Sequence, residues 1–261
     1  MAKQRRVAAR RGPGDDGAVI LIRSILYNVA FFIGTFLTVF FGMVTLLGPW
    51  HWPVRWVSRW ARLMVWMLRV LCGVELKVIG RENLPAGPMI IAAKHQSTFD
   101  TFVWLLLLDA PAYILKKELF NLPFWGWIAR GCGHIAVDRV GGTLALRGMV
   151  RAAKVRIQQG RSIIIFPEGT RSNPGERIAF FPGVAALAGL GVPVIPAATD
   201  SGRLWGRRAF LKRPGTIHLS ILPALPSDLP RTQWMELLAK QIEEETDRLY
   251  RLSETGGQCC G

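Results

Sequence analysis

One histidine is placed where it could act as a general base. His95 follows the apolar run 89–93, which is typical of a buried strand, and Asp100 comes five residues later. Imidazole has an ordinary pKa near neutral pH, so His95 could take the proton of a hydroxyl that attacks a thioester carbonyl. A loop-to-helix turn could bring its ring back to Asp100, which would hold the productive tautomer. His95 and Asp100 are therefore the candidate catalytic pair.

The other histidines are weaker candidates. His134 and Asp138 lie four residues apart in a predicted strand, which would separate them by roughly 13 Å, too far for a hydrogen bond. We interpret His134, His51 and His218 as ordinary structural residues.

A second group of residues could bind an anion. The segment 166–172, Phe-Pro-Glu-Gly-Thr-Arg-Ser, follows another predicted strand. Its turn presents backbone N–H groups, Thr170 and Ser172 add hydroxyls, and Arg171 has the planar guanidinium that suits phosphate oxygens. On its own this segment would also fit an exposed turn with one surface arginine.

Cationic residues follow two further predicted strands. Lys116 and Lys117 end one of them, and Asp138 and Arg139 end the other. Ligand crevices of open α/β sheets lie at the carboxyl ends of the strands, so these cations could converge on one phosphate. Taken singly, each is typical of a surface charge.

The elements that must position these residues follow an α/β pattern. Strands are predicted at 75–79, 89–93, 112–115, 134–137, 162–166, 194–198 and 216–221, and helices at 98–108, 143–159, 183–190 and 233–252. This alternation predicts an α/β fold with a largely parallel sheet flanked by helices.

A membrane-associated helical segment is predicted before this domain. Residues 24–47 are almost entirely apolar and uncharged, and they exceed the roughly 20 residues that cross a hydrocarbon core. The segment 60–74 is also apolar but carries Arg62 and Arg69, which favours an amphipathic interfacial helix or the returning arm of a hairpin.

Composition supports contact with lipid. Half of the 261 residues are hydrophobic, ten are tryptophan and the formal net charge is +15. Such a charge requires an anionic partner, either nucleic acid or an anionic membrane surface. The chain has no zinc-finger spacing, RNA-binding aromatic signature or basic zipper, so we expect membrane lipids as partners and no nucleic acid.

Other chemistries lack their sequence signatures. The four cysteines have no metal-ligand spacing, so we predict no metal site, and they fit a reducing cytoplasm. The sequence contains neither a Gly-x-Ser-x-Gly nucleophile elbow nor a P-loop.

Four ordered segments between about 89 and 198 resemble the 1-acylglycerol-3-phosphate acyltransferase family. They are His-Gln-Ser-Thr-Phe-Asp at 95–100, Gly-His-Ile-Ala-Val-Asp-Arg at 133–139, Phe-Pro-Glu-Gly-Thr-Arg-Ser at 166–172 and Val-Pro-Val-Ile-Pro at 192–196. Two departures from the family pattern occur: Lys94 stands where many members have asparagine, and 181–183 replaces a stretch that often contains lysine.

The resemblance implies roles for particular residues. His95 would be the general base and Asp100 its partner. The glycerol phosphate would be held by Arg139, Glu168, Gly169, Thr170 and Arg171, with Lys116 as a further cation from the reasoning above, and the acyl site would be lined by Val194, Ile195 and Pro196.

The expected organisation is a basic disordered arm at 1–17, a membrane-anchoring helical segment at 18–74, an α/β acyltransferase domain at 75–253 and a flexible tail at 254–261. The expected reaction moves an acyl group from acyl-CoA or acyl carrier protein, as co-substrate and without another cofactor, to the sn-2 hydroxyl of a lysophosphatidate acceptor. The expected location is the cytoplasmic membrane, with the active site facing the cytoplasm. Alternatives are another lysolipid acceptor, such as lyso-ornithine lipid, and a non-enzymatic basic membrane scaffold.

Overall fold

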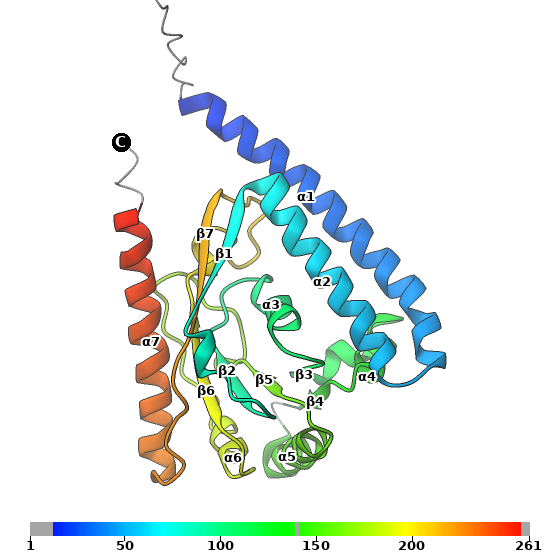
Figure 1. Cartoon of the computed structure of the whole chain (residues 1–261), viewed down its shortest axis with the longest axis vertical. Helices are drawn as coiled ribbons and strands as arrows, with labels where there is room; N and C mark the ends of the chain where they lie inside the picture. Colours follow the sequence, from blue (N-terminus) through cyan, green and yellow to red (C-terminus); the bar gives the residue numbers. More distant parts are fainter. Residues whose placement is uncertain (1–12, 139–140, 257–261) are drawn as a thin grey trace, which may run out of the picture.

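The computed structural model describes residues 13–138 and 141–256 (Figure 1). A helical pair packs along one side of an α/β domain, and a long C-terminal helix lies on the other side (Figure 1). The α/β fold with helices on both faces of a sheet, predicted from the sequence, is confirmed.

Within residues 13–138 and 141–256 the sheet has seven strands, in the order β1-β7-β6-β2-β5-β3-β4. Neighbouring strands are parallel except β6 and β7, which are antiparallel. The strand bounds are β1 Val74–Ile79, β2 Ile90–Ala93, β3 Ala112–Lys116, β4 Ile135–Val137, β5 Ile163–Ile165, β6 Val194–Thr199 and β7 Gly215–Ile221.

Alternate residues of the central strands face two separate cores. Ile91 and Ile195 belong to the core beneath the helical pair, whereas Ile90 and Val194 belong to the core beneath the opposite helices. Parallel strands covered on both faces need apolar side chains on both, which explains the continuous apolar runs in the sequence.

In the described part of the α/β domain the helices are α3 Asp100–Leu107, α4 Trp125–Gly131, α5 Gly142–Gln158, α6 Val184–Ala188 and α7 Arg231–Gly256. Short 3₁₀ helices are η2 Arg81–Asn83, η3 Lys117–Asn121 and η4 Ser201–Arg203. The helices α3, α5, α6 and α7 agree with helices predicted from the sequence, whereas η3 and α4, between β3 and β4, were not predicted. α7 packs on the second core through Trp234, Leu238 and Ile242.

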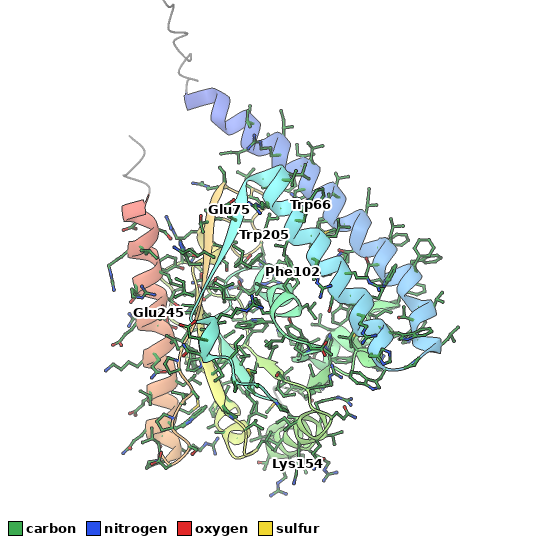
Figure 2. All side chains as sticks on the ribbon, in the orientation of Figure 1. Trp66, Glu75, Phe102, Lys154, Trp205 and Glu245 are labelled. Atoms are coloured by element: carbon green, nitrogen blue, oxygen red, sulfur yellow. The ribbon has the colours of Figure 1, made fainter. Side chains whose placement is uncertain are left out.

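The helical pair consists of α1 Pro13–Gly42 and α2 His51–Cys72, joined by η1 Met43–Leu47. α2 buries one face against the domain through Ala61 and Leu68 and exposes another face, including Trp66. Phe102 of α3 and Trp205 lie in the core between this pair and the sheet (Figure 2).

Among the described residues, one segment, Gly17–Leu47, is long and apolar enough to cross a membrane. Its most apolar stretch of 18 residues has a mean hydropathy of 2.2, and only 6% of that stretch is buried. Its exposed phenylalanines include Phe32, Phe36 and Phe40. An apolar surface of this extent on a soluble protein would be unusual, so it indicates association with a membrane.

The helix ends differ from the predicted organisation at both termini. α1 begins at Pro13, inside the predicted arm, and α7 continues to Gly256, beyond the predicted domain end. The remainder of the predicted arm, 1–12, and the last five residues of the predicted tail lie outside the described residues.

Candidate active site

The loop between β2 and α3 brings His95 and Asp100 together. His95 Nδ1 lies 3.3 Å from Asp100 Oδ2, and the same oxygen accepts the backbone N–H groups of Gln96 and Ser97, each at 2.7 Å. The loop therefore wraps around the carboxylate at the first residue of α3. With Asp100 as the acceptor, Nδ1 carries the proton and Nε2 is left as the basic nitrogen.

Two contacts outside this loop fix the pair further. The hydroxyl of Ser201, which follows β6, donates to Asp100 Oδ1 at 2.7 Å. The His95 ring stacks on Phe166, with centroids 4.0 Å apart and an interplanar angle of 20°. Ser201 was not a sequence candidate, although the rule that functional groups follow strand ends applies to it as well.

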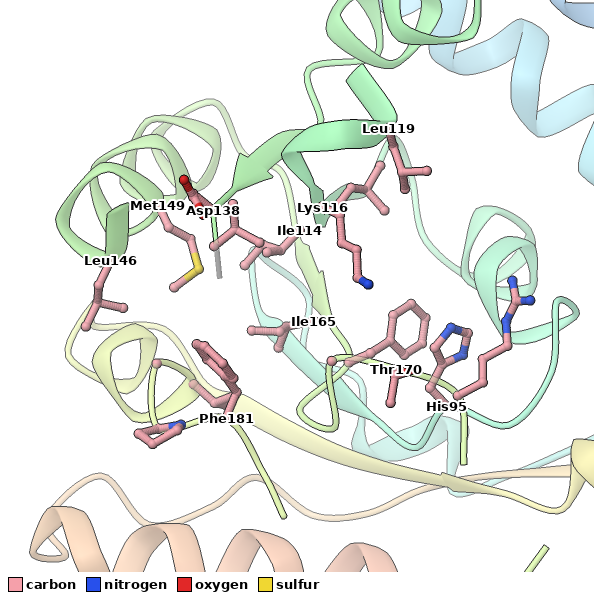
Figure 3. A pocket seen from close by; sticks show the side chains of 18 of the residues that line it. His95, Ile114, Lys116, Leu119, Asp138, Leu146, Met149, Ile165, Thr170 and Phe181 are labelled. Carbon is pink, nitrogen blue, oxygen red and sulfur yellow. The ribbon is translucent and has the colours of Figure 1, made fainter. Parts of the chain in front are cut away.

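His95 lies in the wall of a cavity of about 630 Å³ (Figure 3). Of the predicted site residues, the structure brings His95, Lys116, Gly169, Thr170 and Arg171 to this cavity. They come from the ends of three strands, as the strand-end rule predicts. Figure 3 shows the Lys116 ammonium pointing into the cavity on the side of His95.

Another part of the cavity is apolar. Its lining includes Leu146 and Met149 of α5, Ile165 of β5, and Phe181 (Figure 3). The cavity therefore joins a histidine and cations to a region suited to a hydrocarbon chain.

Glu168 does not lie where a phosphate ligand would. Its side chain is fully buried, with Oε1 2.7 Å from Lys94 Nζ, and Oε2 accepts the backbone N–H of His95 at 2.9 Å. The structure therefore places Glu168 beneath the loop and not in the cavity lining, and its carboxylate is occupied by Lys94 and by the backbone of His95. This position does not support the predicted phosphate-binding role of Glu168, since a buried carboxylate would repel a phosphate.

Lys94 also reaches the C-terminal helix. Its Nζ lies 2.7 Å from Glu243 Oε1 on α7, and its side chain is only 1% exposed. Burial raises the pKa of Glu168, and the charge of Lys94 acts in the opposite direction. On the other side of His95, Gln96 donates to the hydroxyl of Tyr250 at 2.6 Å. Both neighbours of His95 are thus held by α7.

Glu243 and Tyr250 were not among the residues predicted from the sequence to act at the site. Both occupy a helix with ordinary amphipathic spacing, where nothing in the sequence separates them from surface residues. The departure from the family pattern at Lys94 was the one local signal of this network.

Val194, Ile195 and Pro196, predicted to line the acyl site, are buried in β6 and are not part of the cavity lining. They are central-strand residues packed between the two cores, so their side chains are covered by helices. Arg139 lies outside the described residues. Asp138 does line the cavity, and it also pairs with Lys117.

Neither His134 nor His218 lines this cavity. His134 accepts the backbone N–H of Tyr113 at 3.3 Å, and burial lowers the pKa of His134 to about 3. His218 pairs with Asp200, with Nδ1 2.9 Å from Oδ2. Both rings therefore have structural partners.

Residues 75–200 match the sequence model of the family described as Acyltransferase. A 1-acyl-sn-glycerol-3-phosphate acyltransferase of Pseudomonas aeruginosa is 35% identical over 79% of this chain and 82% of its own length. One from Limnanthes douglasii is 28% identical over 85% of this chain and 81% of its own length.

A solved structure shares the fold. The 1-acyl-sn-glycerophosphate acyltransferase of Thermotoga maritima superposes with a TM-score of 0.66 at 22% identity, over 86% of this chain and 97% of that one. Together with the sequence matches and the paired His95 and Asp100 in their expected loop, this similarity leads to one assignment. The chain belongs to the 1-acyl-sn-glycerol-3-phosphate acyltransferase family.

Proposed function

We propose that this protein transfers a fatty acyl group from a thioester to the sn-2 hydroxyl of 1-acylglycerol-3-phosphate, which yields phosphatidate. The observation that carries the proposal is the His95–Asp100 pair in the wall of a cavity with both cationic and apolar parts. The names of the relatives support this acceptor. Acyl-CoA or acyl carrier protein is the proposed donor, and no further cofactor is required.

His95 acts as the general base. Nε2 takes the proton of the acceptor hydroxyl while the hydroxyl oxygen forms a bond to the thioester carbonyl carbon. The tetrahedral intermediate then collapses, the carbon–sulfur bond breaks, and the imidazolium returns the proton to the departing thiolate. Asp100, 3.3 Å from Nδ1, stabilises the imidazolium between these two steps.

The acceptor phosphate binds at the cationic part of the cavity. Arg171 and Lys116 provide charge, and the turn at Gly169 and Thr170 provides polar groups. Gly169 has φ +66°, a conformation that glycine adopts without strain and that lets the chain turn sharply at this point. An acyl chain fits the apolar part beside Met149 and Phe181.

The protein acts at the cytoplasmic face of the membrane in this proposal. α1 exposes its apolar side chains to lipid, while α2 packs on the domain and exposes Arg62 and Arg69 as an interfacial helix would. The reducing compartment fits the buried free thiols of Cys72 and Cys132.

Lys94, which stands where many family members have asparagine, does not favour a different lysolipid acceptor. Its ammonium is buried between two carboxylates, so it cannot contact a lysolipid headgroup.

An acceptor panel tests the proposal. Purified protein in mixed micelles is given labelled acyl-CoA with lysophosphatidate, lyso-ornithine lipid or monoacylglycerol, and the product is identified. We expect lysophosphatidate to be preferred. If lysophosphatidate is not acylated while another lysolipid is, the proposed acceptor is wrong.

Substitution of Arg171 tests how the phosphate is bound. A charge-assisted hydrogen bond contributes about 1.5–3 kcal/mol, so Arg171→Ala should raise the KM for lysophosphatidate about tenfold or more and change the KM for acyl-CoA much less. Arg171→Lys should restore part of the loss, because it keeps the charge but not the planar geometry. Arg177→Ala is the matched control, since Arg177 is exposed, pairs with Asp247 and does not line the cavity. If Arg171→Ala impaired the acylation of monoacylglycerol as much as that of lysophosphatidate, the proposed contact between Arg171 and the phosphate would be wrong.

A further inference from the structure

A second arginine-containing segment lies at the same cavity, outside the family motifs. Residues 206–213, Gly-Arg-Arg-Ala-Phe-Leu-Lys-Arg, connect Trp205 to the strand β7, and we call them the arginine loop. Arg207 and Arg208 of this loop line the cavity that contains His95 and Arg171. This segment carries no motif that predicted a functional role from the sequence.

The arginine loop is held against α1. Asn28 Nδ2 donates to the carbonyl of Phe210 at 3.0 Å, and the backbone N–H of Lys212 donates to Ser24 Oγ at 2.9 Å. Arg213 N–H closes the base of the loop by donating to the carbonyl of Leu204 at 2.9 Å. The loop is therefore fixed between the membrane-associated helix and the cavity.

The side chain of Lys212 anchors the loop from inside. It is buried, contacts Asn28 Oδ1, donates to the Phe210 carbonyl at 2.9 Å and lies 4.7 Å from the Trp205 ring centroid. Lys212 therefore has a structural role, and Arg207 and Arg208 are the residues of the loop that could bind a ligand.

Neither Arg207 nor Arg208 has a hydrogen bond or ion pair to another residue in the described part of the chain. The nearby acid is Glu176, whose pKa is lowered chiefly by the Asn173 N–H and in part by Arg207. Its Oε2 already accepts two hydrogen bonds from Asn173, each at 2.8 Å. The loop arginines thus lack a bidentate carboxylate partner.

Arg207 and Arg171 line the same cavity, and their like charges repel each other. Burial lowers the pKa of Arg171, Arg207 lowers it further, and Asp100 opposes the shift. Arg171 Nε is buried without a hydrogen-bond partner. An anion bound between the two guanidinium groups would reduce their repulsion and could accept a hydrogen bond from Arg171 Nε.

The backbone at Arg208 points to the same conclusion. Its φ is +57°, a left-handed conformation that a long side chain rarely adopts. Such strain persists where the surrounding structure imposes it and is concentrated at ligand-binding sites.

We propose that Arg207 and Arg208 bind the phosphate of a substrate, together with Arg171, and so make this enzyme selective for a phosphate-bearing lysolipid. The inference rests on the proposed function and adds residues to it. The acceptor is the favoured source of the phosphate, because the loop is attached to α1 and exposes Phe210 and Leu211 beside the arginines, where a headgroup at a lipid surface would lie. A phosphate of the donor has the same chemistry and is distinguished by the test.

The test compares Arg207→Gln/Arg208→Gly with Arg213→Ala in mixed micelles of fixed composition. Glycine suits the positive φ at Arg208, so the double variant keeps the loop conformation. Arg213→Ala is a control on the same loop, because Arg213 is exposed and does not line the cavity. Initial rates are measured against lysophosphatidate and monoacylglycerol at saturating acyl-CoA, then against acyl-CoA and acyl-pantetheine at saturating acceptor.

We expect the double variant to raise the KM for lysophosphatidate about tenfold or more, by loss of at least one charge-assisted bond, and to leave monoacylglycerol kinetics and the KM for acyl-CoA nearly unchanged. Arg213→Ala should match the wild type. If instead the KM for acyl-CoA rises and that for acyl-pantetheine does not, the arginines bind a donor phosphate.

The proposal is overturned if the double variant has the same kinetic constants as Arg213→Ala with every substrate. It is also overturned if the activity of the double variant falls equally with phosphate-bearing and phosphate-free substrates. The rate of the wild-type protein with lysophosphatidate distinguishes this result from a failure of the proposed function. A wild type that does not acylate lysophosphatidate refutes that function, whereas an active wild type with an unaffected double variant refutes only the role of the arginine loop.

Discussion

Replacement of Lys94 by methionine should destabilise the protein strongly, because one buried lysine balances two carboxylates. Its Nζ lies 2.7 Å from Glu168 Oε1 and 2.7 Å from Glu243 Oε1. Methionine fills a similar volume but leaves the Glu168 side chain, which is fully buried, without its cation. Removing one partner of a buried ion pair costs about 3–5 kcal/mol.

The loss should depend on pH in a defined direction. Burial raises the pKa of Glu168 in the folded protein, and removal of Lys94 removes the interaction that opposes this shift. A carboxyl group whose pKa is higher in the folded than in the unfolded state favours folding at low pH, and this contribution is lost as pH rises through the folded-state pKa. The free energy of unfolding of Lys94→Met should therefore be lowest relative to wild type at pH 8 and should recover as pH falls.

Thermal unfolding followed by circular dichroism in detergent measures the effect. For a chain of this size, 3–5 kcal/mol corresponds to a decrease in Tm of roughly 6–20 °C. Lys240→Met is the control on α7, because its pair with Glu244 is exposed and such pairs contribute little. The double variant Lys94→Met/Glu243→Gln should have a smaller decrease in Tm than Lys94→Met, since it no longer carries the unpaired charge of Glu243. A Tm of Lys94→Met within about 2 °C of wild type at pH 8 would refute the ion-pair reasoning.

Three further outcomes test the site. His95→Ala should lower kcat about 10²- to 10⁴-fold without changing Tm, and Asp100→Asn should also be severe; near-normal turnover of folded His95→Ala would refute the base assignment. Mass spectrometry after incubation with acyl-CoA alone should find no acyl adduct on Ser97 or Cys132, since transfer is direct and burial raises the pKa of Cys132 to about 12, which keeps its thiol protonated. Met149→Trp should shift the preferred donor to shorter acyl chains, because Met149 lines the apolar part of the cavity, and an unchanged chain-length profile would place the acyl chain elsewhere.

The sequence determined the features that depend on short stretches of chain. His95 and Asp100 could be paired in advance because only the loop between them has to fold for the two side chains to meet. Residues 24–47 could be predicted to be a membrane segment because hydropathy is a property of the segment itself. The strand-end rule placed Lys116 and Arg171 at one cavity, since parallel strands bring their carboxyl ends to the same edge.

Other features of the structure could not be predicted because local patterns do not report what packs above an element. Val194 and Ile195 follow the family motif, but helices cover both faces of β6 and keep them in the cores. The helix α4 was missed because it has only seven residues and follows Phe124, whose φ of +59° gives no recognisable signal in sequence.

The partners of the catalytic loop were decided only by the tertiary structure. The family resemblance implied a phosphate-binding role for Glu168, but the environment of its carboxylate is set by Lys94, which follows another strand. That lysine also pairs with Glu243, 149 residues further along the chain. The free energy of a buried charge depends on its desolvation and on which opposite charges surround it. Both are properties of the packed protein, so the sequence could identify which residues have the right chemistry but not which of them would be left free to use it.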